Sequence, residues 1–264
     1  MQESLRTIAA TRYVTPLHEG GSLPAIIEGD DDGMYVLKFR GAGQGPRALI
    51  AELIAGEIAR ALNLPVPEIV FVELDADLAR TEPDPEIQDL IKKSAGLNLA
   101  LDYLPGSVMF DPIAEKPGAE LASDIVWFDA YVTNVDRTAR NANMLMWHRR
   151  LTLIDHGAAL YFHHSWNNYL KRSVDAFHQV KDHILLPFTT APGLRDADSR
   201  LGPRLTPALL TRIVSMVPDA WLDGASPFQS RQELRSAYVE YLVRRLSEPH
   251  LFLEEAVRAR SLLV

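Results

Sequence analysis

Residues 127–160, WFDAYVTNVDRTARNANMLMWHRRLTLIDHGAAL, decide the fold expected for this chain. The stretch begins as an apolar segment, continues through a polar run, and ends in two short runs of strand-forming residues, Met144–His148 and Leu151–Ile154. The turn at Arg149 and Arg150 is short, so we expect the two strands to pair in antiparallel fashion. This pairing places the beginning of the first strand beside the end of the second.

Three polar side chains flank the predicted hairpin. Asn141 precedes its first strand, Asp155 directly follows its second strand, and Asp136 lies in the polar run before both. We expect the hairpin to make Asn141 and Asp155 neighbours. A carbonyl oxygen beside carboxylates is the ligand set that Mg²⁺ uses when it carries substrate phosphates. The stretch therefore indicates a phosphoryl-transfer site.

The composition of the chain narrows the class of protein. Its 264 residues are 47% apolar, which is enough for one large domain or two small lobes, and the absence of cysteine excludes disulfides and thiolate metal sites. The N-terminus lacks a secretion signal and no apolar run reaches the roughly 20 residues that span a bilayer, so we expect a cytoplasmic protein without a membrane span. The net charge of -8 argues against nucleic acid as a partner.

The N-terminal part of the sequence has the pattern of a β-lobe. Turns at residues 18–22 and 29–33 separate strand-like runs, which predicts an antiparallel meander, and a helical run follows it. A polar stretch at 75–96 is interpreted as a loop with one short helix. The predicted strands are Arg12–Leu17, Leu23–Glu28, Met34–Arg40, 64–74 and Leu97–Leu104, and the predicted main helix is Arg47–Leu62.

Helical periodicity dominates beyond Pro105 and Gly106. We therefore expect an α+β fold with an antiparallel β N-terminal lobe that carries one main helix, residues 1–104, and a mostly α-helical C-terminal lobe, residues 105–264. The helices predicted in the second lobe are Ala119–Thr133, Ser165–Leu185, Pro207–Met216, Arg231–Leu246 and Pro249–Leu263.

Lys38 is the first candidate functional residue of the N-terminal part. It shares a strand face with Met34 and Val36, where a lysine needs either solvent or an anionic partner. The following helix offers two carboxylates, Glu52 and Glu57. A strand lysine that pairs with a helix glutamate and contacts nucleotide phosphates is the arrangement of protein kinases. By spacing alone, an exposed edge lysine explains the pattern better.

The turn Gly20, Gly21 and Ser22 separates the first two strands. Glycines let backbone N–H groups approach a phosphate closely, and the serine hydroxyl adds a donor. Taken alone, the turn is an ordinary hairpin turn, and its position two strands before Lys38 is what favours a phosphate-binding role. No GxxxxGKS/T motif occurs, which disfavours the P-loop class.

Asp136 precedes Asn141 by five residues, the separation between the base and the metal-binding Asn of the kinase catalytic loop. In this interpretation Asp136 orients the attacking hydroxyl and Asn141 binds magnesium. Asp and Asn are also common turn residues, and the pair alone favours turn chemistry. Asp155-His156-Gly157 stands where kinases carry Asp-Phe-Gly, and this third element makes the kinase interpretation the stronger one.

These motifs together resemble the HipA-like kinase family, whose fold is related to those of protein kinases and phosphatidylinositol kinases. The resemblance covers roughly residues 12–165 and implies a bilobal protein-kinase-like fold. The matching segments, in the order of the family, are YVLKF around Lys38, AELIAGEIARALNLPVPE at Ala51–Glu68, ALDYLPG at Ala100–Gly106, NVDRTARNANML at Asn134–Leu145 and LIDHGAALYF at Leu153–Phe162.

The resemblance also implies a role for each candidate residue in phosphoryl transfer from ATP with Mg²⁺. Two alternatives stay open: Glu57 lies on the apolar face of the helix and rivals Glu52, and Asn143 rivals Asn141 as the metal ligand. The implied roles are Asp136 as the catalytic Asp, Lys38 as the ATP lysine, Glu52 as its partner, Asn141 and Asp155 as metal ligands, Gly20, Gly21 and Ser22 as the nucleotide cover, and the backbone of Ala100, Leu101, Asp102 and Tyr103 as the adenine contact.

The acceptor of the phosphoryl group is the least determined part of the prediction. Protein Ser/Thr is the first acceptor by family analogy, and a small-molecule or lipid-headgroup hydroxyl is the alternative. A non-catalytic nucleotide-binding pseudokinase is a further alternative, against which the intact Asp136 argues because a binder has no need of it. Toxins of this family also suggest an antitoxin-like regulator as a partner.

Overall fold

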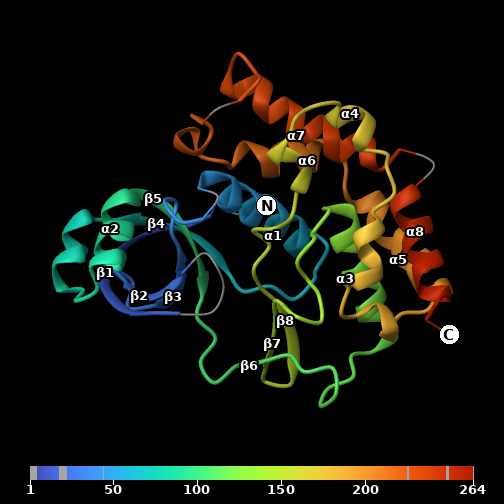
Figure 1. Cartoon of the computed structure of the whole chain (residues 1–264), viewed down its shortest axis with the longest axis horizontal. Helices are drawn as coiled ribbons and strands as arrows, with labels where there is room; N and C mark the ends of the chain where they lie inside the picture. The colour runs from blue at the N-terminus through green and yellow to red at the C-terminus, as the bar shows by residue number, and fades with distance from the viewer. Residues whose placement is uncertain (1–4, 18–22, 44, 225, 248–249, 264) are drawn as a thin grey trace.

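The computed structural model describes residues 5–17, 23–43, 45–224, 226–247 and 250–263. Its fold is a mixed α+β arrangement, in which a barrel of strands lies at one side and most of the helices lie at the other (Figure 1). Helix α1, Pro46–Ala61, lies between the two (Figure 1).

Five strands of the N-terminal part form a closed barrel in the order β1-β2-β3-β5-β4. Neighbouring strands pair antiparallel except β1 and β4, which close the barrel in parallel with Thr7 opposite Phe71. The predicted antiparallel meander of the first three strands is confirmed, whereas the N-terminal lobe that was expected to be antiparallel also contains this parallel pair. Hairpin turns are encoded locally, but the pairing of two distant segments has no local signal. The strands are β1 (Thr7–Pro16), β2 (Ala25–Gly29), β3 (Met34–Lys38), β4 (Ile69–Leu74) and β5 (Gly96–Asp102).

The barrel has its own apolar core, to which a second helix of the N-terminal part contributes. Helix α2, Pro85–Lys93, packs Ile87, Leu90 and Ile91 against the barrel strands. The helix begins at the N-cap Asp84, whose carboxylate accepts a hydrogen bond from the backbone of Glu86. The short helix expected between residues 75 and 96 is thus present, and a 3₁₀ turn at Ala76–Thr81 precedes it.

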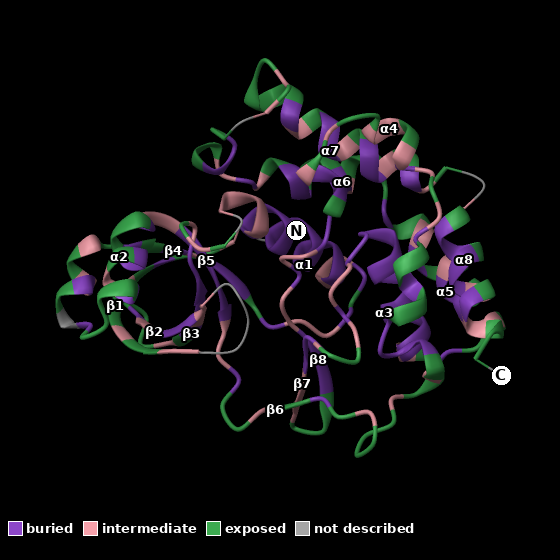
Figure 2. Ribbon diagram, in the orientation of Figure 1, coloured by how far each residue is buried: buried purple, intermediate pink, exposed green. Residues whose placement is uncertain are grey.

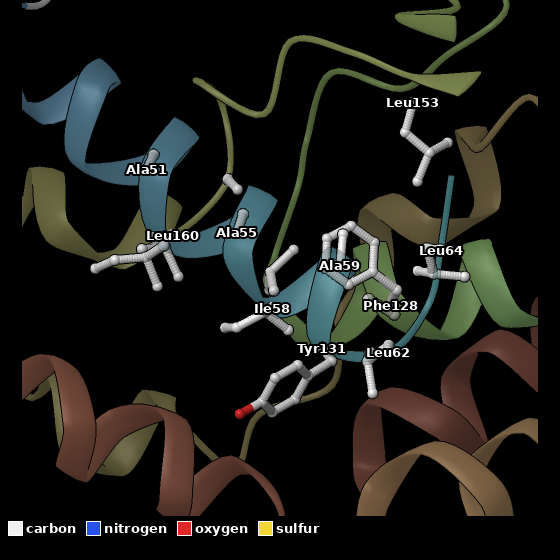
Figure 3. Close-up of a cluster of buried hydrophobic side chains, with 14 of the residues drawn as sticks. Ala51, Ala55, Ile58, Ala59, Leu62, Leu64, Phe128, Tyr131, Leu153 and Leu160 are labelled. Atoms are coloured by element: carbon white, nitrogen blue, oxygen red, sulfur yellow. The ribbon is translucent and has the colours of Figure 1, made fainter. Parts of the chain in front are cut away.

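Helix α1 is buried from Leu49 to Ala59 without interruption, whereas the sequence predicts a helix with one apolar face (Figure 2). A helix that is apolar on all sides belongs inside a core. The buried apolar side chains of α1 belong to the large apolar cluster that also contains Phe128, Tyr131, Leu153 and Leu160 of the C-terminal part (Figure 3). The helix that follows the barrel strands therefore packs chiefly with the second half of the chain.

The predicted hairpin consists of β7, Met144–Trp147, and β8, Arg150–Leu153, and β6, Val108–Met109, adds a third strand. Its turn consists of His148 and Arg149, both with positive φ, as a type I′ turn requires. The turn predicted at Arg149 and Arg150 is therefore displaced by one residue. With Met144 opposite Leu153, the residue that pairs with the end of β8 is Asn143, whose carbonyl accepts from Ile154 N at 3.0 Å.

The C-terminal part is largely helical, as predicted, but one predicted helix is wrong. Within Ser165–Leu185 only α4, Tyr169–Arg172, is α-helical, and a 3₁₀ turn covers His178–Asp182. Tertiary hydrogen bonds replace helical ones there, since Arg245 binds the carbonyls of Ser173 and Asp175. The other helices are α3 (Ala119–Tyr131), α5 (Ala191–Leu201), which was not predicted, α6 (Pro207–Ser215), α7 (Arg231–Arg245) and α8 (Leu251–Ser261).

Across the ranges that the structure describes, every helix is too short or too polar to cross a membrane.

Candidate active site

Lys38 lies at the end of β3 and is enclosed by two carboxylates. Its Nζ donates to Glu52 Oε2 at 2.6 Å and to Asp155 Oδ1 at 2.5 Å. Glu52 comes from the buried helix α1, and Asp155 follows strand β8 of the distant hairpin. The side chain of Glu52 is fully buried, while that of Asp155 is 40% exposed. The lysine thus links the barrel, α1 and the hairpin, and one of its two partners faces solvent.

Ion pairing keeps Lys38 and Glu52 in their charged forms. Burial opposes the charged forms of Lys38 and Glu52, but their attraction outweighs it. The carboxylates of Asp155 and Glu52 raise the pKa of Lys38 above its usual range, and Lys38 together with His156 holds the pKa of Glu52 well below its usual range. The lysine is therefore a permanent cation within an otherwise buried environment.

Glu57, the rival of Glu52, lies one and a half turns further along α1. Its carboxylate pairs with Arg60 at 2.6 Å on the same helix. Of the two glutamates, the structure brings Glu52 to Lys38.

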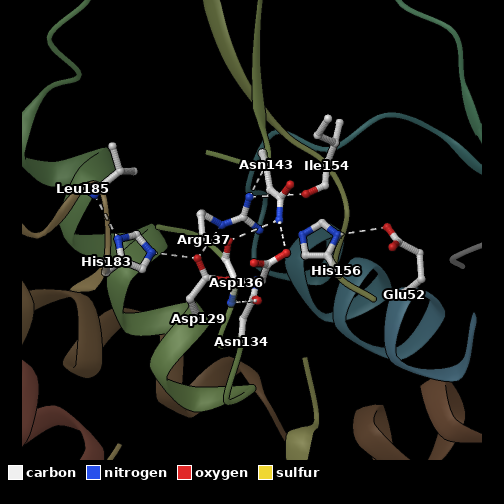
Figure 4. A network of polar contacts seen from close by, with 10 residues as sticks. All are labelled: Glu52, Asp129, Asn134, Asp136, Arg137, Asn143, Ile154, His156, His183 and Leu185. Atoms are coloured by element: carbon white, nitrogen blue, oxygen red, sulfur yellow. Dashed lines mark hydrogen bonds and ion pairs between the residues drawn. The ribbon is translucent and has the colours of Figure 1, made fainter. Parts of the chain in front are cut away.

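Asp136 lies in the loop between α3 and β7, and three asparagines fix it. Figure 4 shows Asn134 and Asn143 beside it. Its Oδ2 accepts from the amide of Asn141 at 2.8 Å and from that of Asn143 at 3.2 Å, while its backbone N–H donates to Asn134 Oδ1 at 3.1 Å. Asn143 is buried, whereas Asn141 is partly exposed. Both rival asparagines therefore orient the Asp136 carboxylate through their nitrogens, and Asn141 is the more exposed of the two residues.

A buried polar network lies directly beneath this loop (Figure 4). Asp129 of α3 accepts hydrogen bonds from Arg137 Nε at 2.6 Å, from Asn134 Nδ2 at 2.9 Å and from His183 Nε2 at 2.9 Å. The backbone N–H of Leu185 donates to Nδ1 of His183, which places the proton of a neutral ring on Nε2. Burial opposes the Asp129 charge, but Arg137 and His183 outweigh it and hold its pKa well below the usual range. The network therefore contains a permanent buried anion.

Arg137 connects this network to the base of the hairpin. Its Nη1 donates to the carbonyl of Asn143, which precedes β7, and to the carbonyl of Ile154 at 3.3 Å, which follows β8. Asn143 and Asp155 both adopt left-handed backbone conformations, with φ of 49° and 54°. Such conformations cost free energy for residues other than glycine and persist only where the surroundings hold them. Arg137 thus holds the two backbone segments that carry Asn143 and Asp155.

The structure brings Lys38, Glu52 and Asp155 together, and it groups Asp136 with Asn141 and Asn143. The hairpin predicts that Asn141 and Asp155 are neighbours. The described hydrogen bonds include none between these two side chains, and the register sets Asn143 opposite Ile154. Carboxylate and amide oxygens at these positions are the hard ligands that Mg²⁺ prefers. The donor set of Asp155 and Asn141 therefore suits a divalent cation.

The residues predicted to contact adenine lie in and just after the central strand β5. Ala100, Leu101 and Asp102 pair with β3 on one side, and the first two also pair with β4 on the other. The backbone N–H of Asp102 donates to Glu68 O at 2.9 Å, and that of Tyr103 donates to Met34 O at 3.0 Å. These two donors are thus already used within the barrel. Gly20, Gly21 and Ser22, the predicted nucleotide cover, lie outside the described residues.

The sequence profile of the HipA-like kinases matches residues 11–254. The chain belongs to the HipA-like kinase family. This match extends well beyond the roughly 12–165 over which the motifs were recognised. No curated protein sequence is similar enough to this HipA-like kinase to count as a match.

Solved structures of other kinases share the fold of this HipA-like kinase. The proinflammatory kinase CtkA of Helicobacter pylori superposes with a TM-score of 0.56 at 14% identity, over 98% of this chain and 99% of that one. The Golgi casein kinase gives 0.55 at 12% identity, over 96% and 75% of the two chains. The same kinase with Mn and ADP bound gives 0.54 at 12% identity, over 97% and 74%. At these identities the similarity concerns the fold.

Four residues support the site although the sequence predicted no role for them. Arg137 and Asp129 hold the loop, His183 supports Asp129, and His156 contacts Glu52. A charge inside an apolar helix, as in WFDAYV around Asp129, is a signal that could have been used, because a buried carboxylate needs partners. The partners themselves come from distant segments, which the sequence does not indicate.

Proposed function

We propose that this protein transfers the γ-phosphoryl group of ATP, with Mg²⁺, to a hydroxyl group, and that protein Ser/Thr is the first acceptor to test. The observation that carries the proposal is the pair of groupings described above: a buried lysine held between Glu52 and Asp155, and an Asp136 carboxylate oriented by two asparagines. A buried cation of this kind can bind phosphate groups, and an oriented carboxylate can accept the proton of a hydroxyl group. Family membership as a HipA-like kinase supports the same reaction class.

Asp136 is proposed as the residue that accepts a hydrogen bond from the attacking hydroxyl. Oδ2 of its carboxylate is used by Asn141 and Asn143, so we assign the acceptor hydroxyl to Oδ1. Two neutral donors on one oxygen orient the carboxylate without adding a positive charge beside it. Positioning of this kind contributes to rate by holding the nucleophile near its line of attack.

Asp155 and the amide oxygen of Asn141 are proposed to hold the metal ion. Mg²⁺ and ATP, when bound, supply the transferable phosphoryl group and the neutralisation of its charge. Asp155 is the more exposed partner of Lys38, so it can turn to a cation while Glu52 keeps the lysine paired. The solved Golgi casein kinase with Mn and ADP supports use of a nucleotide and a divalent metal by this fold.

The remaining parts of the proposal rest on analogy. The nucleotide cover by Gly20, Gly21 and Ser22, the adenine contact at Ala100–Tyr103 and an antitoxin-like regulator follow the resemblance. The proposed cytoplasmic location follows the sequence pattern. A small-molecule or lipid-headgroup acceptor is the alternative to protein Ser/Thr.

The decisive experiment is incubation of the purified protein with labelled ATP and a lysate of its own cells, followed by mass spectrometry of phosphorylated products. Asp136→Asn is the matched variant, because it keeps the hydrogen-bonding shape of the side chain and removes its charge. We expect labelled acceptors with the wild type and a loss of at least about a hundredfold in the variant, the lower range for a general acid–base group. A wild type that binds ATP and transfers phosphate to no acceptor would contradict the proposal and favour a pseudokinase.

A further inference from the structure

His156 is a buried histidine beside Glu52, and the proposed mechanism gives it no role. Its side chain is 2% exposed, and its ring meets Phe128 edge-on with centroids 5.8 Å apart. Nδ1 lies 3.3 Å from Glu52 Oε1, and Nε2 has no hydrogen-bond partner within the part of the chain that the structure describes. Figure 4 shows the ring directed at the Glu52 carboxylate. Among the described residues, the imidazole thus has its polar contact with Glu52, the partner of Lys38.

The two carboxylate oxygens of Glu52 have different partners. Oε2 accepts from Lys38 at 2.6 Å, and Oε1 faces His156 Nδ1. A carboxylate on a helix retains rotation about its terminal bond, so a contact at one oxygen alone leaves its plane undetermined. A donor at each oxygen fixes that plane, and with it the direction in which Lys38 is held.

The contact with Glu52 places a proton on Nδ1 of the His156 ring. A carboxylate can only accept, so Nδ1 must donate. His156 therefore acts as a hydrogen-bond donor of fixed direction.

The position of His156 in the chain gives this contact its significance. Asp155 and His156 are consecutive, and they contact the two members of one ion pair: Asp155 binds Lys38, and His156 binds Glu52. Resting on the proposed function, we propose that His156 is a positioning residue that keeps Glu52 directed at Lys38 when Asp155 leaves the lysine for the metal–nucleotide complex. Because Asp155 and His156 are adjacent in the chain, a movement of the proposed metal ligand Asp155 is then coupled to Glu52 through His156.

Two substitutions separate this role from a merely structural one. His156→Phe keeps the ring volume and the contact with Phe128 but removes the donor. His156→Asn leaves a cavity beside Phe128, yet its amide nitrogen takes the place of Nδ1. We therefore expect the asparagine variant to be the less stable protein and the phenylalanine variant to be the weaker nucleotide binder.

The measurements are thermal unfolding and calorimetric titration with ADP and Mg²⁺. We expect His156→Phe to bind ADP about tenfold more weakly than the wild type, which corresponds to about 1.4 kcal/mol, and His156→Asn to bind within about threefold of it. Equal affinity of the phenylalanine variant and the wild type would overturn the proposal. A weaker affinity in the asparagine variant than in the phenylalanine variant would also overturn it, because ADP affinity would then depend on packing beside Phe128 and not on the hydrogen-bond donor.

A crystal structure of His156→Phe without nucleotide supplies a readout that does not depend on the proposed reaction. We expect the Glu52 carboxylate to rotate and its contact with Lys38 to lengthen, and an unchanged Glu52 would count against the role of His156. If the wild type binds no ADP, the proposed kinase function fails, and the position of Glu52 in this variant still decides the inference about His156.

Discussion

Lys38 and Asp155 lie 2.5 Å apart although 117 positions separate them in the chain. The contact joins the last residue of barrel strand β3 to the second residue after strand β8 of the hairpin. Because Asp155 is also the proposed metal ligand, the lysine occupies the carboxylate that a cation would need. Lysine and metal are therefore competitors for Asp155 until phosphates arrive to pair with both.

Replacement of Lys38 by methionine is expected to strengthen binding of a metal ion alone. The wild type should bind Mn²⁺ weakly in the absence of nucleotide, and Lys38→Met should bind it about fivefold more tightly, since a partly exposed ion pair is worth about 1 kcal/mol. Titration followed by electron paramagnetic resonance measures the free ion directly. Lys171→Met, which removes an exposed lysine, serves as the control and should leave Mn²⁺ affinity unchanged. Equal affinities in all three proteins would show that Lys38 does not compete for Asp155.

Substitution of the two glutamates of α1 should give different results. Glu52→Gln removes the buried partner of Lys38, so we expect a stability loss of about 3 kcal/mol, at the low end for a broken buried ion pair because Asp155 remains, and a weaker affinity for ATP. Glu57→Gln affects only the pair with Arg60, and its ATP affinity should match the wild type. Urea unfolding and calorimetry provide both values. An unchanged ATP affinity in Glu52→Gln would remove this residue from the site.

Arg137→Met tests the network beneath the catalytic loop. The side chain of Arg137 is fully buried, and its loss leaves the Asp129 carboxylate with fewer donors while it frees the carbonyls of Asn143 and Ile154. We expect the free energy of unfolding to fall by about 3–5 kcal/mol, the usual effect of removing one partner of a buried pair. The matched control is Arg195→Met, whose arginine pairs with Glu254 on the surface and should contribute little. Comparable losses in the two variants would contradict the importance of burial here.

Because of His163, we expect the free energy of unfolding to fall at mildly acidic pH. The ring is fully buried against Tyr238, and burial, together with the nearby His164 and Arg47, lowers the pKa of His163 well below its usual range. The unfolded chain therefore binds a proton that the folded chain excludes, so the contribution of the neutral ring is present above the ordinary histidine pKa of about 6.5 and is lost as the pH falls below it. Urea unfolding at pH 8 and pH 5 measures the difference. His163→Gln should reduce that difference, and a difference equal to that of the wild type would exclude His163 as its source.

The sequence predicted the local structure of this site better than its long-range contacts. The hairpin, the helix that carries Glu52 and the strand that carries Lys38 are each encoded by periodicity and turn residues over a few positions. The turn was nevertheless placed one residue late, because a type I′ turn usually carries Asn or Gly and here consists of His148 and Arg149. In the observed register Asn143 faces Ile154, and Asn141 lies two residues further from the hairpin.

The predictions that were wrong have one physical cause, which is contacts between segments distant in the sequence. The helix predicted at Ser165–Leu185 is replaced by short turns because Arg245, from the far end of the chain, binds the carbonyls there. The closure of the barrel depends on β4 returning to β1 in parallel. Neither Arg245 nor β4 carries a local sign of its partner, and side-chain patterns within one element cannot supply it.

Helix α1 shares its core with the C-terminal helices, and Arg204 from that part donates to the carbonyls of Ala61 and Leu62 at the end of α1. Glu52 therefore cannot be withdrawn from Lys38 by a swing of its helix without exposing a large part of the protein's interior. We therefore expect the Lys38–Glu52 ion pair to stay formed whenever the protein is folded, and any control of the proposed activity to act elsewhere than on α1.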